Sequence, residues 1–227
     1  MAQLLRIAID GPAGAGKSTV AKILAKRLGY TYVDTGAMYR SLTLLAIRNG
    51  VAIDSEAAVS QWLRELQFSL DMKFDGDTLA VHVNGEDVTE AIRTAQVSNA
   101  VTVVAQYQCV REFLLAQQKQ WAQRPGVIMD GRDIGTVIMP NAEVKFFLVA
   151  GLRERALRRQ AELEKKGQII PLEEIEDSIA RRDAQDAARQ TAPLAQAEDA
   201  IEIDTTALTI DEVVELMIAH IEQAMEG

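Results

Sequence analysis

The sequence predicts an α/β protein built around a parallel β-sheet, and three observations lead to this prediction. Five short apolar stretches of the kind that form buried strands recur along the chain. Helical patterns separate most of these stretches, which is the alternation of βαβ units. A glycine-rich loop directly follows the first stretch. The five predicted strands are residues 5–9, 31–33, 127–129, 144–149 and 201–203.

The glycine-rich loop predicts phosphate binding. Residues 11–18, GPAGAGKS, fit the pattern G-x-x-x-x-G-K-[ST] of a phosphate-binding loop. Backbone N–H groups at a helix N-terminus, together with one cation, suit a phosphate chain. Gly11, Gly14 and Gly16 allow a tight turn and close approach to phosphates. Lys17 can reach the β- and γ-phosphate oxygens, and the Ser18 hydroxyl can meet a Mg²⁺ ion. A chance glycine-rich turn is the alternative reading.

Three helices are predicted beside these strands. After the loop, the apolar positions of residues 19–28 fall on one helical face, and Gly29 is expected to end that helix. Residues 211–225 carry a second apolar stripe and predict a C-terminal helix that closes the core. A third helix is expected over residues 105–115, where Cys109 is read as a small core residue rather than a nucleophile.

Two segments depart from the simple alternation. Residues 67–74 and 78–83 each alternate polar and apolar side chains around a turn at 75–77, which predicts a small antiparallel sheet within an insertion over residues 40–105. Residues 152–167 form a charged helical pattern, and Pro171 is expected to begin another helix. Because the first of these helices is polar on all sides, it predicts a mobile cover rather than core.

Composition narrows the class of protein. The 227 residues are 48% hydrophobic and 25% charged, as in ordinary globular proteins. Because the sequence shows no membrane-length apolar run and no signal-peptide pattern, we expect a cytoplasmic protein. The single cysteine fits a reducing compartment, and the isolated His82 and His220 indicate no metal cluster. The acidic surface and the lack of an obvious exposed apolar stripe favour a monomer.

The charge distribution points to a small anionic ligand. A net charge of −9 argues against a nucleic acid polymer as partner. Seven of the sixteen arginines nevertheless lie between residues 153 and 189. A local concentration of arginine beside a phosphate-binding loop suits a small anion, although ion pairs with Glu154, Glu162 and Asp186 on a solvated helix face would explain some of them.

Further candidate residues follow the predicted strands. Thr35 and Arg40, after the second strand, can share a phosphate, or they can be a helix start with a surface arginine. Asp130, after the third strand, is a candidate for orienting Mg²⁺ and its waters, although Asp-Gly is also a common turn. Two sets of charged residues have spacings that would place each set on one face of a helix. Each set can bind phosphate or a ribose hydroxyl, or can form ion pairs on the protein surface. These sets are Arg155 with Arg159, and Arg182, Asp186 with Arg189.

Taken together, these motifs make the chain resemble the bacterial cytidylate kinases, the (d)CMP kinases of the nucleoside monophosphate (NMP) kinase family. The likeness runs from the phosphate-binding loop to the C-terminal helix, and the long insertion with its antiparallel sheet is part of it. The matching stretches are residues 9–19, 34–40, 92–93, 110–112, 130–137, 154–156 with 158–159, and 182–183 through 192–194.

The resemblance implies a P-loop three-layer fold with a five-stranded parallel sheet, an NMP-binding region and a short helical lid. The implied core comprises residues 1–39, 106–151 and 171–227, with the NMP-binding region at 40–105 and the lid at 152–170. ATP would bind Gly11, Pro12, Ala13, Gly14, Ala15, Gly16, Lys17, Ser18 and Thr19. Ser18, and Asp130 through water, would hold Mg²⁺.

The resemblance also assigns the residues for CMP. The base would be held by Thr102, Arg111 and Asp133, the phosphate by Thr35, Arg40, Arg132 and Arg189, and the sugar by Arg182 and Asp186. Thr35 and Thr102 stand where the family often has serine, so the hydroxyl is kept with an added methyl group. Lys17, Arg132, Arg155 and Arg159 would surround the transferring phosphoryl group.

Two other classes of function compete with this expectation. A kinase for UMP, AMP or shikimate would keep the phosphate-binding loop and the arginines but would read its acceptor with other residues. A nucleotide-dependent switch would hydrolyse ATP or GTP slowly without an acceptor. The chain contains no Asn-Lys-x-Asp motif for guanine, which argues against a GTPase. The expected reaction is transfer of the γ-phosphoryl group of MgATP to CMP or dCMP.

Overall fold

The computed structural model describes residues 4–75, 78–165, 167–189 and 191–226. All five predicted strands are present, and their order in the sheet is β2-β6-β1-β7-β8. The strands are β1 (Arg6–Asp10), β2 (Thr31–Asp34), β6 (Val127–Gly131), β7 (Val144–Val149) and β8 (Ile201–Asp204). Each is within two residues of its predicted bounds. Among the described residues, no helix is both long and apolar enough to cross a membrane.

The chain divides into two compact units, and each is described by itself. The first unit comprises residues 1–30 and 125–227, and the second comprises residues 31–124. Strands β6, β1, β7 and β8 therefore belong to the first unit, together with the phosphate-binding loop. Strand β2 and the whole insertion belong to the second unit.

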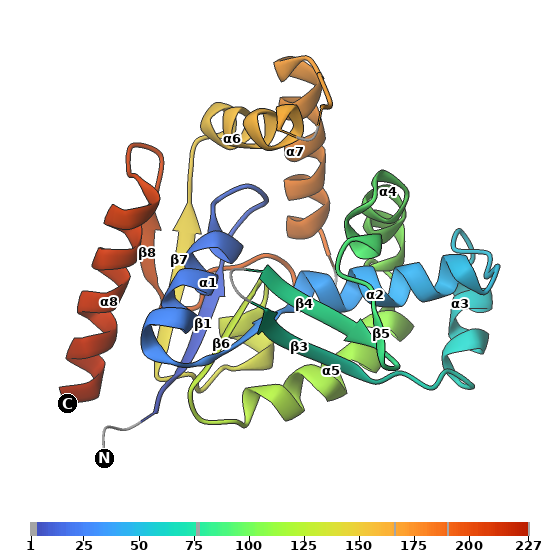
Figure 1. Ribbon diagram of the computed structural model, residues 1–227, viewed down its shortest axis with the longest axis horizontal. Coiled ribbons are helices and arrows are strands. Elements are labelled where there is room, and N and C mark those ends of the chain that lie inside the picture. The colour runs from blue at the N-terminus through green and yellow to red at the C-terminus, as the bar shows by residue number, and fades with distance from the viewer. Residues whose placement is uncertain (1–3, 76–77, 166, 190, 227) are drawn as a thin grey trace. The chain divides into compact units, whose positions relative to one another are not determined.

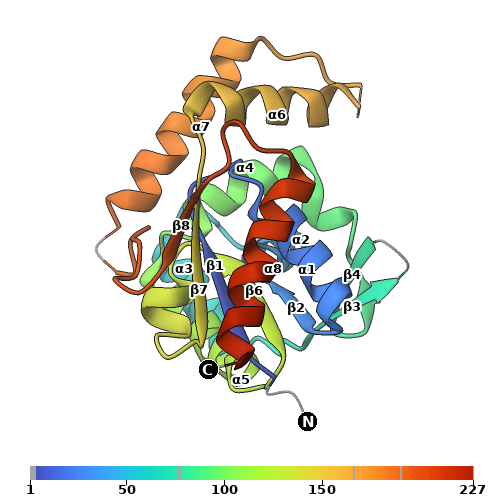
Figure 2. The same cartoon turned by 90° about the vertical axis from the view of Figure 1, so that its left-hand side faces the viewer.

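In the first unit, β1 pairs in parallel with β6 on one side and with β7 on the other. Helix α1 (Lys17–Leu28) follows the phosphate-binding loop and ends, as predicted, at Gly29, which adopts φ +68°. Helix α8 (Ile210–Glu226) lies along the strands (Figure 2) and contacts β7 and α1. It buries Val213, Val214, Met217 and Ile221, so the predicted C-terminal helix does close the core.

Helices α6 (Leu152–Glu164) and α7 (Leu172–Ala187) form a hairpin that the chain enters directly from β7 (Figure 1). The expectation that the first of these helices is polar on all sides is wrong. Ala156 and Leu163 on α6 pack with Ile175 and Ile179 on α7 in a separate small apolar cluster. Two buried residues seven positions apart are enough for this stripe, and the surrounding charged residues conceal it in the sequence.

The second unit contains the small antiparallel sheet that the sequence predicts. Strand β4 (Thr78–Val83) pairs with β3 (Leu70–Asp75) and with β5 (Glu86–Asp87), and Asn84 and Gly85 make the turn between β4 and β5. In the predicted turn at 75–77, residues 76 and 77 lie outside the described part of the chain. The helical elements of this unit are α2 (Thr35–Arg48), α3 (Glu56–Leu63), η1 (Ala91–Arg93), α4 (Ala95–Val104) and α5 (Gln108–Ala122).

The helix predicted over residues 105–115 begins later than expected. Helix α4 ends at Val104 with Ala105 as its C-cap, and α5 begins at Gln108 after Tyr107. Apolar residues on both sides of this break obscure it in the sequence. Cys109 lies in the first turn of α5 and is half-buried, so its predicted place in the core is also wrong. Burial and the neighbouring charge of Glu56 raise the pKa of its thiol, which opposes a nucleophilic role.

Candidate functional site

The parallel register of the first unit brings two predicted motifs to the same end of the sheet. Ile9 lies opposite Asp130, and Asp10 lies opposite Gly131. The phosphate-binding loop, which follows β1, therefore begins at the end of the sheet where residues 130–133 lie at the end of β6. Ligands of open α/β sheets bind beyond the carboxyl ends of the strands, so this end of the sheet is the candidate site.

The glycines of the phosphate-binding loop are required by packing within the protein as well as by access to a ligand. A Cβ atom at Gly11 would lie 2.1 Å from the carbonyl oxygen of Leu148 in β7. At Gly14 it would lie 3.1 Å from the Cβ of Arg155 in α6. Both glycines have positive φ angles, +145° and +78°, which L-residues rarely adopt. The loop is thus pressed closely against β7 and α6.

The two residues predicted to hold Mg²⁺ meet in the structure. The Ser18 hydroxyl donates to Oδ2 of Asp130 at 2.7 Å, and Asp130 is buried at the end of β6. A hydroxyl and a carboxylate are the hard oxygen ligands that Mg²⁺ prefers. Among the described residues there is no group of three or more His, Cys, Asp and Glu that could hold a metal ion. The donor set therefore fits an ion that takes its remaining ligands from phosphates and water.

Lys17, the loop lysine, is buried beside other charges. Its ammonium donates to the carbonyl oxygen of Pro12 at 2.7 Å. Burial, and next the positive charge of Arg132, hold the pKa of Lys17 well below its ordinary value, although Asp130 and Asp10 oppose this shift. A phosphate chain beside the ammonium would favour its charged form.

Asp186 joins two of the predicted phosphate-binding arginines. Its Oδ2 accepts from Nε of Arg132 at 2.8 Å, and its Oδ1 accepts from Nη2 of Arg189. Burial alone would raise the pKa of Asp186, but the charges of Arg132 and Arg189 outweigh it and leave the pKa below its ordinary value. The predicted helical stripe is wrong in one respect. Helix α7 ends at Ala187, and Arg189 reaches Asp186 from the segment beyond. Arg182 lies on α7 with an exposed position.

Asp10 is a residue that the motif analysis missed. Its carboxylate accepts from the backbone N–H groups of Ile134 and Gly135 at 2.9 and 2.7 Å. These residues begin the short π-helix η2 (Ile134–Ile138), directly after Asp133. Asp10 therefore anchors the backbone next to the residue that the resemblance assigns to the cytosine base. The sequence could have drawn attention to Asp10, because it is an acidic residue at the end of an otherwise apolar strand, directly before the glycine-rich loop.

The arginines predicted for the lid have different surroundings. Arg155 is buried and donates to the Ala13 carbonyl at 2.9 Å and to Asp183. Arg159 is largely exposed and pairs with Glu162 at 3.0 Å. Arg158, which was not assigned a role, donates to the Thr205 carbonyl at 2.6 Å. Arg155 therefore lies at the loop, whereas Arg159 forms a surface ion pair, which the sequence analysis gave as the alternative to phosphate binding.

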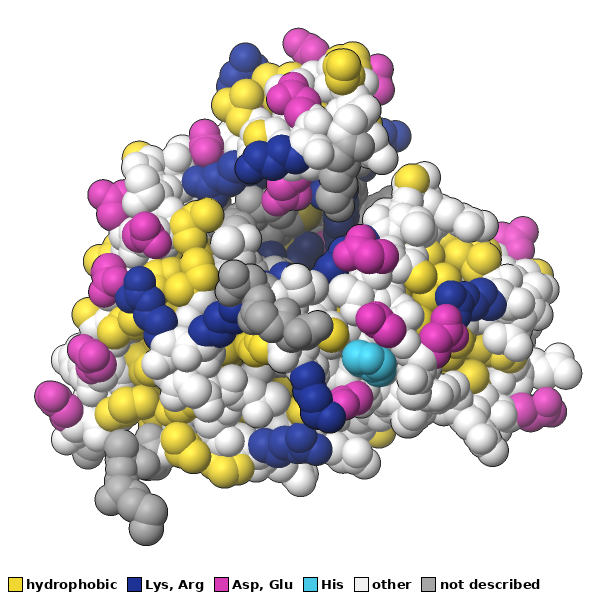
Figure 3. Space-filling view, in the orientation of Figure 1, with side chains coloured by type: hydrophobic (Ala, Val, Ile, Leu, Met, Phe, Trp, Pro, Cys, Tyr) yellow, Lys and Arg dark blue, Asp and Glu magenta, His cyan; other side chains and the backbone are white. Residues whose placement is uncertain are grey.

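Figure 3 shows acidic and basic side chains interspersed on α6 and α7. The three acids named in the sequence analysis are all partners of arginines. Glu154 pairs with Arg158, Glu162 with Arg159, and Asp186 with Arg189. Local ion pairs thus account for part of the arginine concentration, as the alternative reading proposes. Arg132 and Arg155 gain their contacts across the first unit instead.

In the second unit, Thr35 and Arg40 lie at the start of α2. Asp34 is the N-cap of this helix, and its Oδ1 accepts from the Ala37 N–H at 2.8 Å. Its Oδ2 accepts from Nη2 of Arg40 at 2.9 Å. A Cβ at Gly36 would lie 2.8 Å from Nη1 of Arg40, so the glycine leaves room for the guanidinium. Sequence reasoning missed the parts of Asp34 and Gly36 in holding this arginine.

Thr102 and Arg111, the other two residues assigned to the base, also lie in the second unit. The guanidinium of Arg111 lies over the ring of Tyr39, 5.9 Å from its centroid, and the side chain is buried. The Thr102 hydroxyl donates to the Asn99 carbonyl of its own helix at 2.6 Å. Asp133 belongs to the first unit. The residues assigned to CMP are therefore divided between the two units.

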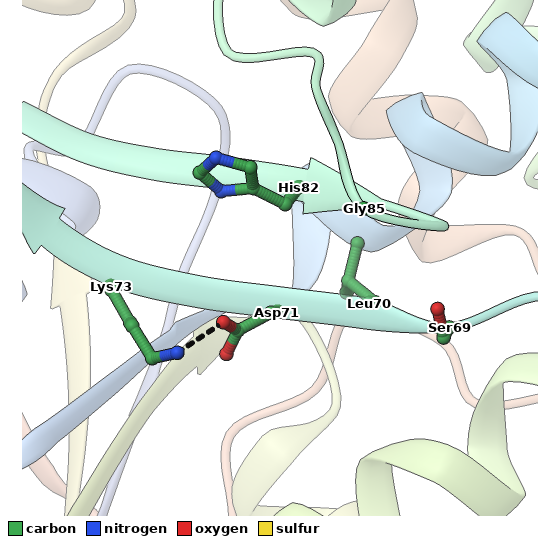
Figure 4. Close-up of a pocket in the computed structure, with 6 residues that line it drawn as sticks. All are labelled: Ser69, Leu70, Asp71, Lys73, His82 and Gly85. Carbon is green, nitrogen blue, oxygen red and sulfur yellow. Dashed lines mark ion pairs between the residues drawn. The ribbon is translucent and has the colours of Figure 1, made fainter.

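A hollow on the small antiparallel sheet lies outside this set of residues (Figure 4). Asp71 and Lys73 on β3 form an ion pair of 2.6 Å within it, and His82 on β4 also lines it. It contains none of the residues predicted for nucleotide or acceptor. Its lining residues are half-buried or exposed, and none of them is a buried polar group of the kind on which ligand sites converge.

Comparison with known proteins identifies the family. The family model for cytidylate kinase matches residues 7–223. A cytidylate kinase of Bacillus licheniformis is 52% identical over 98% of this chain and 98% of its own length. One from Geobacillus sp. is 56% identical over 93% of each chain, and one from Bacillus subtilis is 49% identical over 98% of this chain and 99% of its own.

A solved structure of an uncharacterized protein from Eubacterium ventriosum shares the fold, with a TM-score of 0.51 and 13% identity. The match covers 96% of this chain and 98% of that chain. The structural likeness extends over most of the chain, and the family model covers residues 7–223. On the family model and the sequence identity to these relatives, the chain belongs to the cytidylate kinase family.

Proposed function

We propose that this protein transfers the γ-phosphoryl group of MgATP to CMP or dCMP, giving ADP and CDP or dCDP. The observation that carries the proposal is the meeting of Ser18 with Asp130 beside the phosphate-binding loop, in a chain of the cytidylate kinase family. ATP binds residues 11–19. Ser18, and Asp130 through water, would hold Mg²⁺, which would supply positive charge to neutralise the phosphates.

CMP is read at its base by Thr102, Arg111 and Asp133. The N4 amino group of cytosine is a hydrogen-bond donor that suits the carboxylate of Asp133, and the acceptor edge of the base suits the guanidinium of Arg111. Uracil carries an acceptor in place of the N4 amino group. Two acceptors would then oppose each other at Asp133, at a cost of about 1–3 kcal/mol. UMP is therefore a poor substrate.

The CMP phosphate is held by Thr35, Arg40, Arg132 and Arg189, and the sugar by Arg182 and Asp186. The ion pairs of Asp186 with Arg132 and Arg189 support this assignment because they fix both guanidinium groups in place. Phosphoryl transfer depends on positioning and charge neutralisation. Lys17, Arg132, Arg155 and Arg159 supply the positive charge around the transferring group, and the chain contributes no nucleophile.

The test is the initial rate of ADP release with MgATP and, in parallel, CMP, dCMP, UMP, AMP, GMP or shikimate, with a control lacking acceptor. Fast turnover with CMP and dCMP alone is the expected result. Preference for another acceptor would keep the nucleotide loop and overturn the assignment of the base. Equal ADP release without any acceptor would instead indicate a nucleotide-dependent switch.

The variant Asp133→Ala tests how the base is read. We expect kcat/KM for CMP to fall roughly tenfold to a hundredfold, which corresponds to about 1–3 kcal/mol of lost transition-state binding. The dissociation constant of ATP, measured by calorimetry, should stay within about twofold because residues 11–19 are untouched. Unchanged turnover of CMP in this variant would refute the role given to Asp133.

A further inference from the structure

The backbone of Ala13, in the middle of the phosphate-binding loop, is bonded on both sides by charged groups of the α6–α7 hairpin. Its N–H donates to Oδ1 of Asp183 at 3.1 Å. Its carbonyl oxygen accepts from Nη1 of Arg155 at 2.9 Å. The same Nη1 also donates to the other carboxylate oxygen of Asp183. Asp183, Arg155 and Ala13 thus form a closed ring of hydrogen bonds.

Packing holds this ring in place. Arg155 is only 7% exposed, and its Nε donates to the Ala150 carbonyl at 2.9 Å. The backbone of α6 at Arg155 also lies against Gly14, where a Cβ would come within 3.1 Å of the Cβ of Arg155. Asp183 lies in the C-terminal half of α7, with 20% of its side chain exposed. The arginine is fixed by burial, whereas the carboxylate is the more accessible partner.

Asp183 makes the contacts that a phosphate oxygen would make at this point of the loop. The N–H groups of a phosphate-binding loop are donors to phosphate, and an arginine beside them is a second donor to the same group. A carboxylate that accepts from both a loop N–H and Arg155 is an anion in the same position. We infer that Asp183 is an anionic placeholder that competes with the terminal phosphate of the nucleotide for Ala13 and Arg155.

The exchange leaves every charge compensated. When the γ-phosphate accepts the bonds of Ala13 and Arg155, the buried guanidinium exchanges a carboxylate for a phosphate and does not have to move. The displaced carboxylate of Asp183 has access to water because its side chain is partly exposed. Binding of ATP therefore breaks the bonds of Ala13 and Arg155 to Asp183, and this loss reduces the free energy gained from the γ-phosphate. Asp183 accordingly lowers the affinity for a triphosphate and sets the selectivity between ATP and ADP.

This inference rests on the proposed binding of ATP to residues 11–19, and the variant Asp183→Asn tests it. The amide removes the charge and keeps the size of the side chain. We expect ATP to bind about three- to tenfold more tightly, because one charge-assisted contact no longer competes. ADP, which lacks the γ-phosphate, should bind within about twofold of its original affinity. Both dissociation constants are measured by calorimetry with Mg²⁺ present.

Asp177→Asn is the matched control, since it makes the same chemical change on α7 at an exposed position. Asp177→Asn should leave the affinities for ATP and ADP unchanged, because Asp177 is not among the residues that bond Ala13. If the loss of any negative charge on α7 tightened nucleotide binding, both variants would show the effect. Weaker or unchanged ATP binding by Asp183→Asn would overturn the inference and would make Asp183 a support for Arg155. Equal tightening of ATP and ADP would also overturn it, since the competition would then not be at the γ-phosphate.

A measurement on the unaltered protein avoids any dependence on how the variant folds. The ¹⁵N resonance of the Ala13 amide and the ¹³C resonance of the Asp183 carboxyl are followed by NMR. The imido analogue of ATP should shift both resonances. ADP, whose β-phosphate also contacts the loop, should leave the resonance of the Asp183 carboxyl in place. A shift of neither with the analogue would overturn the inference. Formation of CDP, measured separately, tests the proposed function and does not depend on these results.

Discussion

At the scale of single residues, the buried carboxylate of Asp10 gives the protein a measurable dependence on pH. Burial raises the pKa of Asp10 to about 6, the negative charge of Asp133 adds to this effect, and the N–H groups of Gly135 and Ile134 oppose it. Lys17 also opposes it. The folded protein therefore binds a proton at Asp10 more tightly than the unfolded chain, whose pKa is the ordinary 3.8.

Protonation of Asp10 consequently stabilises the fold. Its contribution is fully present below pH 3.8 and is lost as the pH rises through about 6. Unfolding in denaturant should show that the stability of the unaltered protein, relative to Asp10→Asn, falls over this range by on the order of 3 kcal/mol. Asp199→Asn is a control of opposite sign, because the bond from Lys145 lowers the pKa of Asp199. If the difference in the free energy of unfolding between the unaltered protein and Asp10→Asn did not change with pH, this account would be refuted.

At the scale of elements, the small apolar cluster is what holds α6 against α7. Leu163 is 8% exposed within this cluster, so Leu163→Ala should cost about 2–5 kcal/mol of local stability. Hydrogen exchange should become faster in α6 and α7 while the strands β1, β6 and β7 stay protected. Ile169→Ala is the matched control, since Ile169 is 90% exposed between the two helices. Faster exchange throughout the first unit would show instead that the hairpin does not open independently.

At the scale of the whole molecule, the assigned ligand residues are distributed unequally over the two units. Residues 11–19, assigned to ATP, lie in the first unit, whereas those assigned to CMP come from both. Hydrogen exchange should therefore show that ATP protects amides of the first unit and that CMP protects amides of both. The amides around Arg40 and Arg111 are the ones to follow in the second unit. Protection by CMP that is confined to one unit would contradict the assignment.

The parts of this molecule that the sequence reveals are those with local patterns. Periodic apolar residues locate the five strands and α8, and a contiguous motif locates the phosphate-binding loop. The positions beyond the strands also place Ser18 and Asp130 at one end of the sheet, because parallel strands share their carboxyl end. Such features depend on neighbours within a few residues, and the chain therefore displays them directly.

The contacts that escape sequence reasoning join residues far apart in the chain. Ala13 and Asp183 are 170 positions apart, and Asp10 and Gly135 are 125 apart. No periodicity relates such pairs, because their meeting depends on how whole elements pack. The apolar side of α6 was not predicted for another reason. It consists of Ala156 and Leu163, which stand among charged residues in the sequence. The break between α4 and α5 falls at residues 105–107, which include no proline or glycine that would mark it in the sequence.

The closeness of Gly11 to the Leu148 carbonyl has a consequence for redesign of this enzyme. Because a side chain at position 11 would overlap the backbone of β7, the first turn of the loop takes its shape from a strand that touches no ligand in the proposed site. A library that varies only the loop will find position 11 closed to every other amino acid. To change how the loop opens, an engineer would have to move β7, through the core residues on which that strand rests.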